Sequence, residues 1–118
     1  MFRKFLVTSA LVALSAPAFA FGNVSVIDQL GIGNGAAAFQ SGAFNASGIG
    51  QVGISNGALH VQGGIGNVAG TAQFGVANSS TVGQLGLGNI SGTLQTGDFD
   101  SATHTQVGGG NVALTVQN

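Results

Sequence analysis

The chain has 118 residues, with two basic and three acidic side chains, 22 glycines and no cysteine. Both basic residues, Arg3 and Lys4, lie at the N-terminus, so residues 21–118 contain no Lys or Arg. Contacts with phosphate and attraction to anionic lipid headgroups both need cations, so this composition excludes a nucleic-acid partner and an electrostatic membrane anchor. The lack of cysteine excludes disulfides and lipoprotein processing.

The first twenty residues have the pattern of a secretory signal peptide. Arg3 and Lys4 form a short basic region, a mostly apolar run extends from Phe5 to Leu14, and Ala18-Phe19-Ala20 has the small-x-small form of a cleavage site. The apolar run is too short to cross a hydrocarbon core, which needs about 20 residues. We therefore expect residues 1–20 to be a cleaved signal, residues 21–118 to be the mature domain, and the protein to be secreted without membrane insertion.

Four columns of residues recur every 11 positions along the mature chain, with no insertion between them. A glycine follows two positions after each of the first eight glutamines, an Asn or Asp comes three positions later, and a small residue comes two positions after that. The glutamines are Gln29, Gln40, Gln51, Gln62, Gln73, Gln84, Gln95, Gln106 and Gln117. The glycines are Gly31, Gly42, Gly53, Gly64, Gly75, Gly86, Gly97 and Gly108. The third column holds Asn23, Asn34, Asn45, Asn56, Asn67, Asn78, Asn89 and Asn111, with Asp100 between the last two. An uninterrupted period of this kind indicates a repeat architecture.

Alternation within the unit predicts a β-strand. Asn67, Ala69, Thr71 and Gln73 share one parity and would all point to the same face of a strand. The following x-Gly-x-x segment is short and suited to a tight arc, so we expect seven strand residues and four arc residues in each unit, with the glycine column in the arcs. Such units stack as a β-solenoid, in which equivalent residues lie above one another.

The period alone leaves open whether a coil contains two strands or three. His60 and His104 share a column and differ by 44, which is a multiple of 22 but not of 33. This spacing favours two strands in each coil. Both histidines are interpreted as ordinary occupants of the column, because two coils would separate them by roughly 10 Å, too far to share one metal ion.

The two amide columns predict ladders between coils. A single buried Gln or Asn would leave its amide unpaired, which is costly. In a stack each amide can donate to its copy in the next coil, as in cross-β assemblies. Glutamate would fail at this place because stacked carboxylates repel. We therefore interpret the Gln and Asn columns as self-assembly amide ladders.

These columns resemble the curlin repeat, Q-x-G-x-x-N-x-A-x-x-x-Q. The pattern reads Gln51-Val-Gly53-Ile-Ser-Asn56-Gly-Ala58 through to Gln62, and it recurs from Gln106 to Gln117. The resemblance covers essentially the whole mature chain. It implies an all-β, two-sheet β-solenoid of about four 22-residue coils, which becomes cross-β when it polymerises. It also implies an extracellular curli-type amyloid fibre on the bacterial cell surface, for biofilm matrix, adhesion and cell aggregation, with a nucleator subunit, a chaperone and an outer-membrane secretion channel as partners.

The ends of such a solenoid suggest how it would assemble. Soluble proteins protect open strand edges with Lys, Pro or bulges. The mature chain has no Lys, and the single proline of the sequence is Pro17. We therefore expect open end coils to add further copies of the same chain. Asp98-Phe99-Asp100 departs from the pattern in the seventh unit, so a minor or nucleating subunit remains as an alternative to a major one.

Two functions of other classes are less well supported by the sequence. No acid, base or nucleophile constellation predicts an enzyme, and nothing predicts a cofactor or metal site. A monomeric surface- or ice-binding solenoid would use a flat outward ladder of threonines. Thr71, Thr93 and Thr115 do share one column at 22-residue spacing, but their parity assigns them to the interior.

Overall fold

The structure is a computed structural model that describes residues 21–118, in which every regular element is a β-strand. The expected signal peptide, residues 1–20, lies outside the described residues. Each 11-residue unit forms one strand, because its alternating inward and outward side chains suit a pleated surface. The strands are β1 (Val24–Ile32), β2 (Gly35–Ala43), β3 (Ala46–Ile54), β4 (Gly57–Ile65), β5 (Val68–Val76), β6 (Ser79–Leu87), β7 (Ile90–Gln95), β8 (Ser101–Gly109) and β9 (Val112–Gln117).

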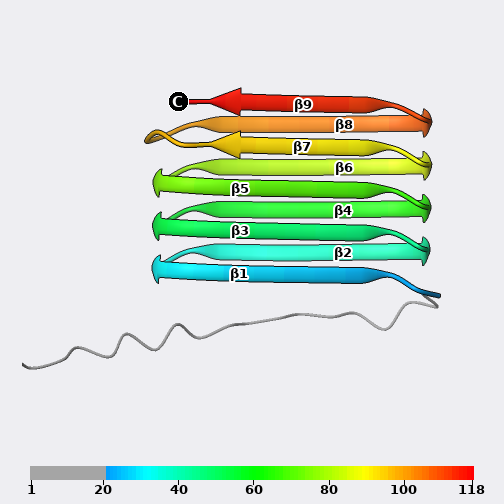
Figure 1. The fold of residues 1–118 in the computed structure, drawn as a ribbon, viewed down its shortest axis with the longest axis horizontal. Coiled ribbons are helices and arrows are strands. Elements are labelled where there is room, and N and C mark those ends of the chain that lie inside the picture. The colour runs from blue at the N-terminus through cyan, green and yellow to red at the C-terminus, as the bar shows by residue number, and fades with distance from the viewer. Residues whose placement is uncertain (1–20) are drawn as a thin grey trace, which may run out of the picture.

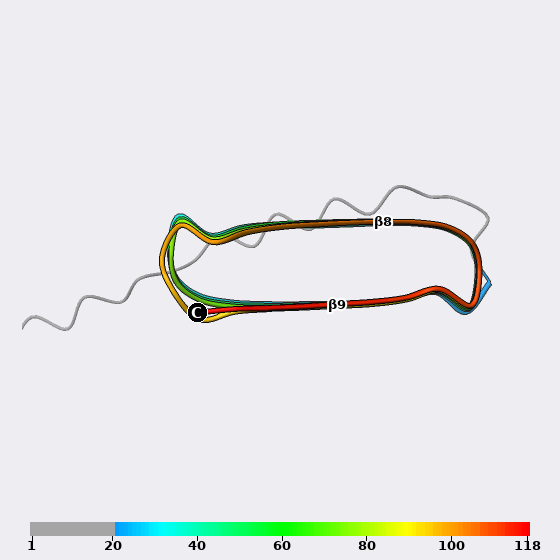
Figure 2. The same cartoon turned by 90° about the horizontal axis from the view of Figure 1, so that it is seen from above.

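Successive strands alternate between two parallel sheets (Figure 1). One sheet has the order β1-β3-β5-β7-β9 and the other the order β2-β4-β6-β8. Each strand pairs in register with the second strand after it along the chain, so that Gln51, for example, lies opposite Gln73. Seen along the stack, the coils superimpose as one flat oval with two long sides (Figure 2). The predicted two-sheet β-solenoid with two strands in each 22-residue coil is confirmed.

The limits of strand and turn differ from those expected from the sequence. Seven of the nine strands contain nine residues rather than seven, and two-residue turns join most of them. The glycine column, with the exception of Gly97, lies inside the strands and not in the arcs. The asparagines of the column lie outside the strands, and those from Asn45 to Asn89 are buried, so their side chains still point inward. The backbone hydrogen bonds between strands continue through the glycine column, because a residue without Cβ accepts the positive φ required there. This angle is +127° at Gly31.

The interior of the solenoid is polar and its outer faces are apolar. Five hydrophobic side chains are buried, against eighteen polar or ionisable ones. Large apolar side chains such as Leu30, Phe74 and Val112 lie on the outside, 69, 46 and 74% exposed. Hydrogen bonds within the stack, rather than a hydrophobic core, must therefore hold the coils together.

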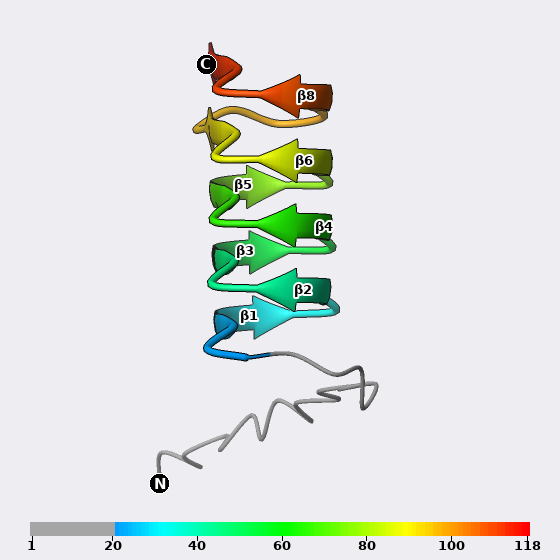
Figure 3. The same cartoon turned by 90° about the vertical axis from the view of Figure 1, so that its right-hand side faces the viewer.

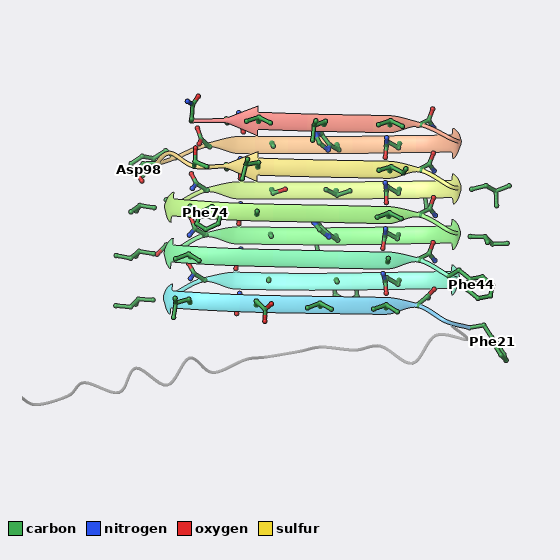
Figure 4. All side chains as sticks on the ribbon, in the orientation of Figure 1. Phe21, Phe44, Phe74 and Asp98 are labelled. Atoms are coloured by element: carbon green, nitrogen blue, oxygen red, sulfur yellow. The ribbon has the colours of Figure 1, made fainter. Side chains whose placement is uncertain are left out.

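The diverged seventh unit alters the path of one strand. β7 ends at Gln95, and Gly97 does not pair with Gly75 in the ladder. The carboxylate of Asp98 instead accepts a hydrogen bond of 2.9 Å from the N–H of Val76 in the coil below. Asp98 projects from the edge of the stack at this turn (Figure 4). The side chain of Asp98 thus bonds to the neighbouring strand β5.

Candidate functional site

The glutamine column forms two continuous ladders, one in each sheet. Each Nε2 donates to the Oε1 of the glutamine one coil later, over 2.7–2.9 Å in all seven pairs. The glutamines of the middle coils are at most 1% exposed, and Gln73 and Gln84 are fully buried. Because every amide in a ladder points the same way, the stack has a polarity along its axis.

The second N–H of each glutamine ties one sheet to the other. Gln51 donates to the backbone carbonyl of Gly35 at 3.0 Å, and Gln62 donates to that of Ala46 at the same distance. This contact recurs for eight of the nine glutamines, always with the residue 16 positions earlier. A glutamine in the interior therefore uses both N–H groups, so the buried amides do not incur the usual cost of desolvation.

The asparagine column stabilises the turns rather than forming the predicted side-chain ladder. The Oδ1 of Asn56 accepts from the backbone N–H of Asn78, one coil further on, at 3.0 Å. Its Nδ2 donates to two backbone carbonyls, those of Val52 and Gly75. Amide-to-amide bonds are present only between Asn67 and Asn45 and between Asn111 and Asn89 among the described residues. The expectation that each asparagine amide pairs with its copy is therefore wrong for most of the column, because these amides bind backbone groups instead.

The glycine column sets the closest approach between coils. A Cβ built on Gly64 would lie 1.9 Å from the carbonyl oxygen of Gly86, and one on Gly31 would lie 1.8 Å from that of Gly53. Real Cβ atoms do not come within 3.0 Å of such an atom. A side chain at any of the six glycines of this column from Gly31 to Gly86 would push the coils apart. These positions therefore require glycine for stacking as well as for their positive φ.

A fifth column, the residue before each asparagine, was missed by sequence reasoning. All nine of its members adopt φ between +56° and +70°. Five are glycine, which is the signal that could have revealed the column. The other four are Phe44, Ser55, Ala77 and Phe99, which accept this conformation at some cost. Phe21 and Phe44 project beside each other from one edge of the stack (Figure 4).

The two histidines link the sheets through the interior. In His60, Nδ1 lies 2.7 Å from the hydroxyl of Ser47 and Nε2 lies 2.7 Å from that of Thr71. His104 makes the equivalent contacts with Ser91 and Thr115. Burial lowers the pKa of His60 from its ordinary 6.5 to about 4, so the ring is neutral at pH 7.

The threonine column lies inside the solenoid. Thr71 and Thr93 are only 4 and 5% exposed. Thr71 bonds to His60, whereas the hydroxyl of Thr93 is buried without a partner among the described residues. The column therefore offers no outward ladder of hydroxyl groups for an ice surface.

Both ends of the stack repeat the pattern of the middle coils while leaving its hydrogen bonds incomplete. At the C-terminal end, Gln106 and Gln117 each donate only to a carbonyl of the opposite sheet. At the N-terminal end, the Oε1 atoms of Gln29 and Gln40 accept no hydrogen bond from the described residues. One end thus presents glutamine N–H groups and the other presents glutamine oxygens.

The surroundings of Gly108 also show that the C-terminal end of the stack is open. Six glycines of its column have a carbonyl oxygen of the next coil where a Cβ would lie, at 1.8–2.1 Å. Gly108 meets only the Nδ2 of Asn111, at 3.7 Å, because β8 is the outermost strand of its sheet in the described chain. Gly108 therefore lies at the open edge of its sheet.

The described residues contain no helix that is long and apolar enough to cross a membrane. They also contain no group of three or more His, Cys, Asp or Glu side chains placed to hold a metal ion. A comparison of the chain with protein-family models, curated proteins and solved structures found no match. The interpretation of this site therefore depends on its own geometry and on the repeat columns.

Proposed function

We propose that the chain is a structural subunit that assembles head to tail, by stacking of coils, into an extracellular curli-type amyloid fibre. The observation that carries this proposal is the match between the two ends. Glutamine N–H groups at Gln106 and Gln117 face outward at one end, and glutamine oxygens at Gln29 and Gln40 face outward at the other. A second copy stacked with the same polarity along the axis can complete both ladders without any change in conformation.

The edges of the terminal strands support addition of a further copy. Strand edges present rows of N–H and C=O groups that pair readily with another chain. Residues 21–118 contain no Lys or Pro to block such pairing. Parallel stacks of identical segments with glutamine ladders are among the most stable protein assemblies. The ladders also favour the correct register, since a slip of one residue would place glutamines opposite apolar residues.

The outer faces support a role in adhesion and lateral association. Among the exposed side chains of the five-stranded sheet are Val24, Leu30, Ile54, Ile90 and Val112, each between 47 and 74% exposed. Exposed apolar patches of this kind are typical of interaction surfaces. The resemblance to the curlin repeat supports the biofilm matrix as the setting, with a nucleator subunit, a chaperone and an outer-membrane secretion channel as partners.

Proline substitution at the open edge tests the proposal. Val24 donates its N–H to Asn45 of the next coil. Because N–H directions alternate along a strand, Val112 and Leu114 of β9 direct theirs to the open edge. Leu114→Pro should therefore fold but fail to accept another copy. Gly92, which pairs with Leu114 in register, is the matched control, because Gly92→Pro removes a bond within the chain.

The assay is elongation of fibre seeds by purified residues 21–118, followed with thioflavin fluorescence. Leu114→Pro alone should elongate seeds at least tenfold more slowly than the unchanged chain, because it caps the end that it joins and cannot add to the other end, whereas Gly92→Pro should be unfolded and should not cap. Elongation of Leu114→Pro at the rate of the unchanged chain would overturn the proposal that the open strand edges are the assembly surface.

A further inference from the structure

The described solenoid contains an odd number of strands, and this determines how two copies can meet. Nine strands divide into a sheet of five and a sheet of four. Each strand lies half a coil above the one before it, on alternating sides of the stack (Figure 3). At the C-terminal end β9 is therefore the last strand of one sheet and β8 the last of the other. The next copy can begin with β1 above β9, or with β1 above β8.

Placing β1 above β9 would leave a defect. The five-stranded sheet would continue without interruption. In the other sheet, the strand after β8 would be β2 of the next copy, which would lie one coil further from β8 than pairing allows. The upper edge of Ser101–Gly109 would then face a slot one strand high. Its backbone N–H and C=O groups, and the free N–H of Gln106, would be enclosed without partners, which folded proteins avoid.

Placing β1 above β8 leaves no slot. If the register found within the chain continues across the junction, Gln106 comes to lie beneath Gln29 of the next copy and Gln117 beneath Gln40. The space above Gly108 receives Gly31 of the next copy, so the backbone contact that defines the glycine column is restored. Both sheets then continue without a break.

We infer that successive copies stack with a half-coil offset, so that each is rotated by half a turn about the fibre axis and its five-stranded sheet continues the four-stranded sheet of the copy below. This inference rests on the proposed function, because it specifies the geometry of the same end-to-end contact. Two copies make nine coils, so the fibre repeats every 43 Å or so at about 4.8 Å for each coil.

The half-coil offset also makes the two faces of the fibre equivalent. Hydroxyl side chains gather on the outer face of the four-stranded sheet, as at Thr81, Thr103 and Thr105. The five-stranded sheet presents mostly Val, Ile, Leu and Gly at the corresponding outward positions. The half-turn between copies alternates these two surfaces along each side of the fibre.

Engineered cysteine pairs distinguish the two arrangements, since the chain has no cysteine of its own. Val26, Thr103 and Leu114 are all exposed on outer faces, of β1, β8 and β9 respectively. The half-coil offset places Val26 of the next copy beside Thr103, at the spacing of adjacent strands, which a disulfide can bridge. The arrangement with β1 above β9 places it beside Leu114 instead.

The experiment compares V26C/T103C with V26C/L114C after growth of fibres under reducing conditions, followed by oxidation and denaturing electrophoresis. We expect V26C/T103C to give a ladder of covalent dimers, trimers and longer species, and V26C/L114C to remain monomeric. A ladder from V26C/L114C, or none from either variant although both form thioflavin-positive fibres, would overturn the half-coil offset. If neither variant forms fibres while the three single-cysteine variants also fail, it is the proposed function that is refuted.

Discussion

Replacing Gln73 by glutamate removes two hydrogen-bond donors from the most buried part of a ladder. Gln73 is fully buried, donates to Gln95 at 2.7 Å and to the carbonyl of Gly57 at 3.0 Å, and accepts from Gln51 at 2.7 Å. A carboxylate in its place would still accept from Gln51. It would also face the oxygens of Gln95 and Gly57, which it can only repel.

The free-energy cost of Gln73→Glu comes mainly from protonating the new carboxyl group in the folded state. To avoid a buried charge the new carboxyl group must bind a proton, which from an ordinary pKa near 4.3 costs about 4 kcal/mol at pH 7. The protonated acid restores one of the two donors and leaves the other acceptor unpaired, for about 1 kcal/mol or more. The total of about 5 kcal/mol equals the lower end of the range of stabilities of typical domains.

The measurement is the protein concentration left in solution when fibre growth of residues 21–118 reaches its plateau. Gln73→Glu should raise this concentration at least 100-fold at pH 7, and the excess should shrink at pH 4, where protonation costs little. Val76→Thr is the control, because Val76 contributes no side-chain hydrogen bond to a ladder. Equal plateau concentrations for the two variants at pH 7 would refute the ladder account.

Three further predictions test other parts of the stack. Gly64→Ala should prevent coil stacking because its Cβ would lie 1.9 Å from a backbone oxygen, whereas Gly66→Ala, with open space around it, should cost about 1 kcal/mol in chemical denaturation. Thr93→Val should stabilise the fold by about 1 kcal/mol because it removes an unpaired buried hydroxyl, and Thr71→Val should destabilise it; the opposite order would contradict the interior assigned to these residues. The unfolded chain protonates His60 below pH 6.5 and the folded chain only near pH 4, so stability should be complete above pH 6.5 and fall by about 3 kcal/mol towards pH 4. His60→Val should remove that dependence on pH, and an unchanged dependence would refute its assignment to this ring.

The architecture was predictable from the sequence because the stack repeats its own pattern. The columns of Gln and small residues correctly predicted the inward face and the Gln–Gln contacts, such as that from Gln51 to Gln73. Each of these features depends only on spacing along the chain. The spacing of His60 and His104 favoured two strands in each coil, as the structure has it.

Contacts between the two sheets, the partners of the asparagines and the limits of the strands were not predictable from the column period. The approach of Ser47 and Thr71 to His60 joins strands of opposite sheets, which the column period does not specify. Asparagine binds backbone groups because the turn brings carbonyls within reach of its short side chain. The strand continues through the glycine column because a position with positive φ can still pair in a parallel ladder, so glycine at Gly31 does not end β1.

Fibre diffraction from aligned fibres of purified residues 21–118 tests the central claim most directly. Coils stacked along the fibre axis predict a meridional reflection near 4.8 Å, from strands that lie perpendicular to the axis, at about the spacing between paired strands. A chain that stays monodisperse and monomeric at high concentration, or fibres that lack this meridional reflection, would contradict assembly by stacking of coils.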